Sequence, residues 1–392
     1  MGTRQALNVR FTRCTSKSNG SPVRLGLSLA ADLLASVLNI LKVASSPHTG
    51  LPKRALLTDL LKRVSRSFYL TLIVVPRAVR DQLGLAYLFA RAADTIADTD
   101  LIDRNRRLGF LKQFKAQFAE DRIRWDEVRA IQTALVPHQR ESAERTLLER
   151  LEDCFKVYMS FEAEDRKRTR QLMGTLTNGM EMDLTVFPSD SPRHPAALRS
   201  MEELDRYTYY VAGCVGEFWT HMICAHVPSL ARWDLATMGS IGVRFGKGLQ
   251  LTNVLRDAAR DLQRGRCYFP GPMLQKAGLT ASDLLRKDGL VALRPVVVEL
   301  IRIALEHLDQ GWLYTMAIPR REVRLRLACM WPILFAGHTL RRVAASPELL
   351  DPSANVKMPK SQVRLLMALT VLTGACGYLW TAYWGHLRKS VL

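Results

Sequence analysis

The stretch ARAADTIADT (90–99) carries two aspartates four residues apart, and the distant stretch QLTNVLRDAARD (250–261) repeats that spacing. The four residues are Asp94 and Asp98 in the first stretch and Asp257 and Asp261 in the second. Side chains at positions i and i+4 share one face of an α-helix. We therefore predict a helix over each stretch, with both carboxylates of a pair on the same face.

Each predicted helix carries a longer line of polar side chains on that face. The line consists of Tyr87, Arg91, Asp94 and Asp98 in the first helix, and of Gln250, Asn253, Asp257 and Asp261 in the second. An apolar stripe lies beside the first line and is formed by Leu85, Leu88, Phe89, Ala92 and Ile96. Together the two patterns predict a helix that is packed on one side and borders a polar site on the other.

Four carboxylates brought together inside a helical bundle repel one another, so they either take up protons or recruit cations. Mg²⁺ binds one or two carboxylates together with water and substrate phosphate oxygens. The two aspartate pairs therefore predict a magnesium site that holds a diphosphate ester. The alternative for each pair alone is a solvated helix face, and two matching polar lines favour the metal site over it.

The rest of the chain has the composition of a globular protein, with 392 residues, 48% hydrophobic and 24% charged. Helical periodicity dominates, and Pro and Gly cluster at breaks such as 188–195 and 268–272. We predict an all-α fold, a single helical bundle around a central cavity. The net charge of +19 favours an anionic partner. Because this charge is dispersed and no nucleic-acid motif is present, we expect no nucleic acid as partner.

Both ends of the chain differ from this predicted catalytic region (residues 51–350). Residues 1–50 form a basic extension, which is either a targeting segment or a disordered tail. Residues 351–392 contain an uncharged run of 21 residues, 365–385, that is long enough to span a bilayer. A final core helix and an interfacial anchor are the alternatives. If the run is an anchor, deletion after about Lys360 should leave a folded catalytic domain.

Four ordered motifs resemble the squalene and phytoene synthases, and most closely the squalene synthases. The motifs are SRSFYLTLIVVP (65–76), AYLFARAADTIADT (86–99), YTYYVAGCVG (207–216) and GLQLTNVLRDAARDLQRGRCYFP (248–270). The similarity covers roughly residues 53–360, including NGMEMDL (178–184) and VKMPKSQVR (356–364). The resemblance implies an isoprenoid-synthase-type bundle that condenses two farnesyl diphosphates head to head through presqualene diphosphate. Squalene synthases then reduce this intermediate with NADPH.

The resemblance also implies roles for individual residues. Asp94, Asp98, Asp257 and Asp261 would bind Mg²⁺ and the two diphosphates. The catalytic group would comprise Tyr87, Tyr207, Arg91 and Arg256. The substrate-binding group would comprise Phe68, Ser65, Arg66, Val211, Val215, Gly216, Gln250, Asn253 and Arg266. The structural alternatives are arginines paired with the same aspartates, tyrosines satisfied in the core, and glycines that allow close helix packing.

Some features depart from the family pattern or leave alternatives open. The residue before the last aspartate of each motif is commonly acidic in the family, but here it is Ala97 or Arg260. NADPH is implied by the resemblance alone, because no GxGxxG lies between a strand and a helix. A phytoene or dehydrosqualene synthase without reduction is therefore the close rival. A non-catalytic assembly or membrane-binding protein of the same fold is disfavoured because all four aspartates are present. We expect a monomer associated with a membrane, its catalytic domain on the cytoplasmic side.

Overall fold

The chain, described here by a computed structural model, is built almost wholly of helices over residues 55–65, 68–99, 101–286, 289–373 and 376–392. This confirms the predicted all-α fold. The long helices are α5 (Arg77–Asp98), α10 (Ala163–Val186), α13 (Leu235–Gln263), α15 (Gly289–Ala317) and α16 (Val323–Ala345). The shorter ones are α3 (Leu61–Ser65), α4 (Phe68–Val74), α6 (Arg104–Ala116), α7 (Trp125–Leu135), α8 (Ser142–Glu149), α9 (Leu151–Met159), α11 (Met201–Thr208), α12 (Cys214–His226), α14 (Gly271–Lys276), α17 (Lys360–Leu372) and α18 (Gly377–Lys389). The predicted N-terminal extension, residues 1–50, lies outside the described residues.

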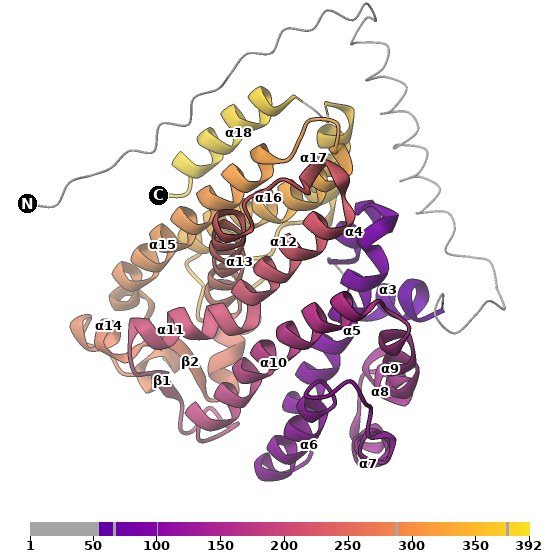
Figure 1. Cartoon of the computed structure of the whole chain (residues 1–392). Helices are drawn as coiled ribbons and strands as arrows, with labels where there is room; N and C mark the ends of the chain where they lie inside the picture. The colour runs from indigo at the N-terminus through magenta and orange to yellow at the C-terminus, as the bar shows by residue number, and fades with distance from the viewer. Residues whose placement is uncertain (1–54, 66–67, 100, 287–288, 374–375) are drawn as a thin grey trace, which may run out of the picture.

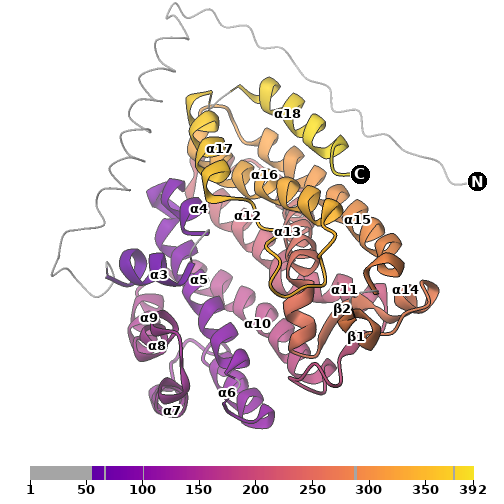
Figure 2. The ribbon, with the colours of Figure 1, turned by 180° about the vertical axis from the view of Figure 1, so that it is seen from behind.

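Helix α13 runs through the middle of the bundle, where it packs against α12 and α15 (Figures 1 and 2). Helix α10 packs against α5, α6 and α12, so it connects the first aspartate helix to the centre. The apolar stripe predicted on α5 is buried throughout, from Leu85 to Ile96. Its Phe89 ring lies 5.0 Å from the Phe118 ring and 4.8 Å from the Phe155 ring. This packing fixes the face of α5 that remains for the polar line.

Helices α12 and α13 approach so closely that backbone meets backbone. A Cβ atom at Gly216 would lie 1.9 Å from the carbonyl oxygen of Gly242, and one at Gly246 would lie 2.1 Å from that of Ala212. Only glycine leaves room for such contacts. Gly216 therefore takes part in close helix packing, and its role in lining a prenyl channel stays a prediction.

We predict that Gly246→Ala lowers the free energy of unfolding by roughly 3 kcal/mol, because the added methyl group forces α12 and α13 apart. Gly239→Ala on the same helix is the matched control, since no neighbouring atom lies within 4 Å of the added Cβ. Helix propensity alone should make that control more stable by up to about 1 kcal/mol. Denaturant unfolding of both variants provides the measurement. Equal unfolding midpoints would show that the close approach has no energetic role.

A tight turn after α13 leads into the small parallel sheet formed by β1 (Ala196–Leu198) and β2 (Arg266–Pro270). Gly265 adopts a φ of 74°, the left-handed conformation typical of the residue that follows a helix. A Cβ there would also lie 2.5 Å from the carbonyl oxygen of Ser189. The turn brings Arg266, the first residue of β2, back beneath the end of α13. This placement matters for the site described below.

The C-terminal segment forms two helices that pack on the bundle, as the alternative of a final core helix expects. The uncharged run is divided between α17 and α18 (Figure 2). Trp331 of α16 donates to Thr370 of α17 (2.7 Å), and Trp384 of α18 stacks on Trp312 of α15 with ring centroids 5.7 Å apart. Among the described residues, no helix is both long and apolar enough to cross a membrane. Polar partners and large aromatic rings suit these helices to the protein interior.

Candidate active site

The two aspartate motifs meet through arginines that follow the second motif. Asp98 is the last residue of α5, and its carboxylate accepts hydrogen bonds from Arg264 (3.2 Å) and Arg266 (3.1 Å). These arginines lie three and five residues beyond Asp261 on the turn after α13. The structure therefore brings the C-terminal ends of α5 and α13 together, as the matching polar lines predicted.

A fifth carboxylate, Asp183 of α10, belongs to the same group. It is paired with Arg266 (3.5 Å) and accepts a hydrogen bond from the Tyr268 hydroxyl (2.9 Å). Burial raises the pKa of Asp183 to about 7, against the opposing influence of Arg266 and Tyr268. Asp183 lies in the NGMEMDL motif, and the sequence predicts no role for it. Because no second aspartate lies four residues after Asp183, the sequence around it contains no i, i+4 pair of carboxylates.

Burial and mutual repulsion raise the pKa of one carboxylate in each aspartate motif. Desolvation, followed by repulsion from Asp98, raises the pKa of Asp94 to about 7. Water still reaches this side chain, 45% of which is exposed, but the helices around it remove much of the solvent. Desolvation and the neighbouring Asp257 and Asp183 raise the pKa of Asp261 to about 8. A group with these properties favours binding of a proton or a cation.

The predicted arginines are paired with the carboxylates. Arg266 is almost buried and contacts both Asp98 and Asp183. Burial alone would lower its pKa, but these two carboxylates raise it. Arg256 donates to the neighbouring Asp257 through Nε (3.0 Å), and Arg91 forms an ion pair with Glu144 of α8 and lies 3.9 Å from Asp94. The guanidinium groups thus balance part of the carboxylate charge.

The two predicted tyrosines occupy different surroundings. Tyr207, near the end of α11, is buried and stacks on Tyr268 with ring centroids 4.6 Å apart. Burial and the nearby Asp183 raise its pKa well above the usual range, so its hydroxyl stays protonated near neutral pH. Tyr87 is half-buried on α5, and its hydroxyl lies 3.5 Å from the carbonyl oxygen of Val64 on α3. Of the two, Tyr207 is the one that borders the carboxylate group.

The remaining predicted binding residues lie on the π-helical turn Tyr209–Gly213 that leads into α12, on α12 and α13, and near the start of the bundle. Val211 is half-buried against Gly179 of α10, and Val215 is half-buried on α12. On α13, Asn253 donates to Gln250 (3.2 Å), one and two turns before Asp257. The Ser65 hydroxyl is buried with no hydrogen-bond partner among the described residues. Arg66 and the side chain of Phe68 lie outside the description.

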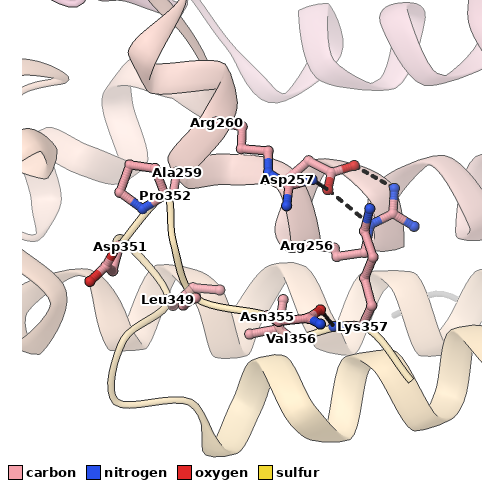
Figure 3. Close-up of a pocket in the computed structure, with 11 residues that line it drawn as sticks. Arg256, Asp257, Ala259, Arg260, Leu349, Asp351, Pro352, Asn355, Val356 and Lys357 are labelled. Atoms are coloured by element: carbon pink, nitrogen blue, oxygen red, sulfur yellow. Dashed lines mark hydrogen bonds and ion pairs between the residues drawn. The ribbon is translucent and has the colours of Figure 1, made fainter. Parts of the chain in front are cut away.

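A pocket opens beside the second aspartate motif, under the segment that connects α16 to α17 (Figure 3). On the helix side it is lined by Arg256, Asp257 and Arg260, and on the segment side by residues such as Asn355 and Lys357. An adjoining cavity of about 460 Å³ is lined by Asp257, Arg260, Asp261, Gln263, Arg264 and Pro352. Acidic and basic groups therefore alternate around a space that is open to a ligand. The VKMPKSQVR motif contributes Val356 and Lys357 to this wall.

The donor set of this site fits Mg²⁺. Its candidate ligands are all carboxylate oxygens, they come from two helices, and the raised pKa values of Asp94 and Asp261 show that their negative charge is disfavoured unless a proton or cation is bound. Within the described parts of the chain, no three metal-binding side chains already converge on one point. Each cation would therefore take one or two carboxylates and complete its shell with water and phosphate oxygens, as Mg²⁺ prefers.

Comparison with known proteins finds one family and several relatives. The profile of the squalene/phytoene synthase family matches residues 61–362. A squalene synthase of Eremothecium gossypii is 24% identical over 84% of this chain and 71% of its own length. A presqualene diphosphate synthase of Rhodopseudomonas palustris is 28% identical over 66% of this chain and 77% of its own. The solved TcSQS complex with the ligand BPH1237 has a similar fold, with a TM-score of 0.66 and 20% identity over 87% of this chain and 97% of that one.

Proposed function

The chain belongs to the squalene/phytoene synthase family of prenyltransferase-type enzymes, and from that premise we propose that it condenses two farnesyl diphosphates head to head through presqualene diphosphate. The observation that carries this proposal is the meeting of the two aspartate motifs around Arg264 and Arg266. Carboxylates that hold cations and arginines that donate to phosphate oxygens are what two diphosphate groups require.

We propose that Mg²⁺ is held by Asp94 and Asp98 on one side and by Asp257 and Asp261 on the other. Bound there, it would neutralise diphosphate charge and stabilise the leaving group. Binding of substrate phosphates would also draw Arg256 and Arg266 from carboxylate to phosphate oxygens, because guanidinium binds both groups in the same way. Asp183 would keep Arg266 in place during that exchange.

Reduction with NADPH to squalene is the second part of the proposal. The relatives include one named for squalene and one named for presqualene diphosphate, so the final product must be measured. Purified enzyme with labelled farnesyl diphosphate should form squalene with NADPH and accumulate presqualene diphosphate without it. Presqualene diphosphate under both conditions would limit the enzyme to the first step. If a phytoene-type or dehydrosqualene product forms with NADPH present, the enzyme is a phytoene or dehydrosqualene synthase and not a squalene synthase.

We predict that Tyr207→Phe slows presqualene diphosphate formation by roughly a hundredfold while the protein stays folded, because the ring is kept and only a hydroxyl beside Asp183 is lost. Tyr209→Phe is the control, since its hydroxyl faces Glu217 (3.4 Å) instead of the carboxylate group. Single-turnover rates and thermal melts of both variants provide the measurements. An unchanged rate in Tyr207→Phe would return this residue to a purely structural role.

We also propose that the enzyme works as a monomer at a membrane surface, with its catalytic domain on the cytoplasmic side. The product of the proposed reaction is a hydrocarbon, which leaves an enzyme more readily into lipid than into water. The net charge of +19 would add attraction to anionic lipid.

A further inference from the structure

Two charged side chains connect the aspartate motifs from outside the carboxylate group. They are Arg107 of α6 and Asp190 of the segment that joins α10 to β1. Arg107 is only 3% exposed, donates to the carbonyl oxygen of Ala97 (2.9 Å) and forms an ion pair with Asp190. Asp190 in turn lies 4.0 Å from Arg266, the arginine that donates to Asp98. We call Arg107 and Asp190 the bridge.

The first contact of the bridge holds the end of α5. The carbonyl groups in the last turn of a helix have no partner within the helix. Arg107 donates to one of them, that of Ala97, and its positive charge lies at the end where the helix dipole is negative. Helix α6 packs against both α5 and α10, so Arg107 starts from a fixed position (Figure 1). The main chain next to the Asp98 carboxylate is therefore anchored to α6.

The second contact of the bridge holds the turn that carries Arg266. The segment around Asp190 packs on this turn, where a Cβ at Gly265 would lie 2.5 Å from the carbonyl oxygen of Ser189. Burial would raise the pKa of Asp190, but the hydrogen bond from Arg107 holds it below its ordinary value. Asp190 is therefore ionised near neutral pH. An ionised carboxylate thus lies beside Arg266 in addition to those of Asp98 and Asp183.

We infer that Arg107 and Asp190 are positioning residues that prepare Asp98 to bind a cation. A cation can reach the Asp98 carboxylate only when Arg266 releases it, and Asp190 offers this arginine another carboxylate. Arg107 keeps Asp190 in reach and keeps the end of α5 in place. Without the bridge, Arg266 stays on Asp98 and competes with the cation. The inference rests on the Mg²⁺ site proposed above and adds residues outside its ligand set.

Two simpler roles for Arg107 predict different results. If Arg107 only caps α5, its removal lowers the melting temperature and leaves the cation affinity of the folded protein unchanged. If Arg107 acts only through its charge, its removal strengthens cation binding, because like charges repel. The positioning role predicts the opposite sign: loss of a positive charge weakens the binding of a cation.

The test is titration of the full chain with Mn²⁺ alone, a cation that also suits carboxylate and water ligands, followed by electron paramagnetic resonance. We expect Arg107→Met to raise the Kd for Mn²⁺ about tenfold. Asp190→Asn should raise it by a similar factor, and the double variant by no more than that, because both substitutions break the same bridge. Arg106→Met is the matched control, since it removes the same charge from an exposed position of α6 and should leave the Kd unchanged.

Thermal melts show that each titration is made on folded protein. Asp257→Asn is the reference for the site, because it removes a proposed ligand and should also weaken Mn²⁺ binding. If Arg107→Met binds Mn²⁺ as tightly as the wild type or more tightly, the inference is overturned and the metal site stands. If Arg107→Met does not fold, a wild-type Kd in Asp190→Asn, whose side chain is 34% exposed, overturns it. Equal binding by the wild type and Asp257→Asn overturns the proposed metal site, and the inference with it.

Discussion

Asp257→Asn should lower kcat/KM at least about a thousandfold, and Asp94→Asn should do the same. Each substitution keeps the size of the side chain but removes one negative charge from a group that we propose holds Mg²⁺ and diphosphate. Asp257→Asn also leaves Arg256 without the carboxylate to which it donates at 3.0 Å. Without this counter-charge, Arg256 would hold the substrate phosphate more tightly and release it more slowly. We therefore expect kcat to fall by a larger factor than the affinity for substrate.

The measurement is the steady-state rate over a range of Mg²⁺ concentrations, with a thermal melt of each variant. Asp309→Asn is the matched control, because Asp309 is also paired with an arginine, Arg388 (2.7 Å), and is half-buried far from the site. Its amide oxygen can still accept the hydrogen bond from Trp384. We expect near wild-type activity in the control. Full activity in both Asp94→Asn and Asp257→Asn would remove the two motifs from catalysis.

The parts of the site that sequence could predict are those written as a local pattern. Asp94, Asp98, Asp257 and Asp261 share an i, i+4 spacing, and helical geometry alone puts each pair on one face. The buried stripe of α5 followed from the same periodicity and is confirmed. Convergence of the two helices could be expected because a buried line of polar side chains requires polar or charged groups opposite it.

Contacts between distant segments could not be predicted in this way. Asp183 meets Arg266 across 83 residues of chain, and nothing near either residue indicates the other. Gly216 illustrates a different limit, since a small residue suits both a prenyl channel and a close helix contact. The close contact becomes visible only from the position of Gly242 opposite it. Long-range packing decides such cases, and a single sequence does not encode it in any short pattern.

For the C-terminal segment, the sequence leaves a membrane span, an interfacial anchor and a final core helix as alternatives. Residues 365–385 form a run without charge, which does not distinguish between them. The hydrogen-bond partners of Thr370 and of the tryptophans show where the helices lie. Trp331 donates to Thr370, and Trp384 donates to Asp309 (2.9 Å). These partners are available in the protein and absent from a bilayer core.

Deletion after Lys360 should therefore unfold the protein, contrary to what the anchor interpretation expects. The deletion removes the buried side chains Leu366, Met367, Val371, Trp380, Trp384 and Leu387. At about 1.5–3 kcal/mol for each of these six buried side chains, the loss is roughly 9–18 kcal/mol. A loss of that size is comparable with the whole stability of a typical domain, about 5–15 kcal/mol. We expect no cooperative melting transition in the truncated chain by circular dichroism.

The full-length variant Trp384→Ala separates a packing effect from a general effect of truncation. It removes the ring that stacks on Trp312 and packs against Gly337, where a Cβ would lie 2.9 Å from the Trp384 ring. We expect it to lower the free energy of unfolding by about 3–5 kcal/mol while keeping a cooperative transition. If the truncated protein melts like the full chain and Trp384→Ala leaves the free energy of unfolding unchanged, α17 and α18 add nothing to the stability of the core. Because side chains of α15 and α16 hold both helices, we expect the opposite result: α17 and α18 belong to the core that the fold requires.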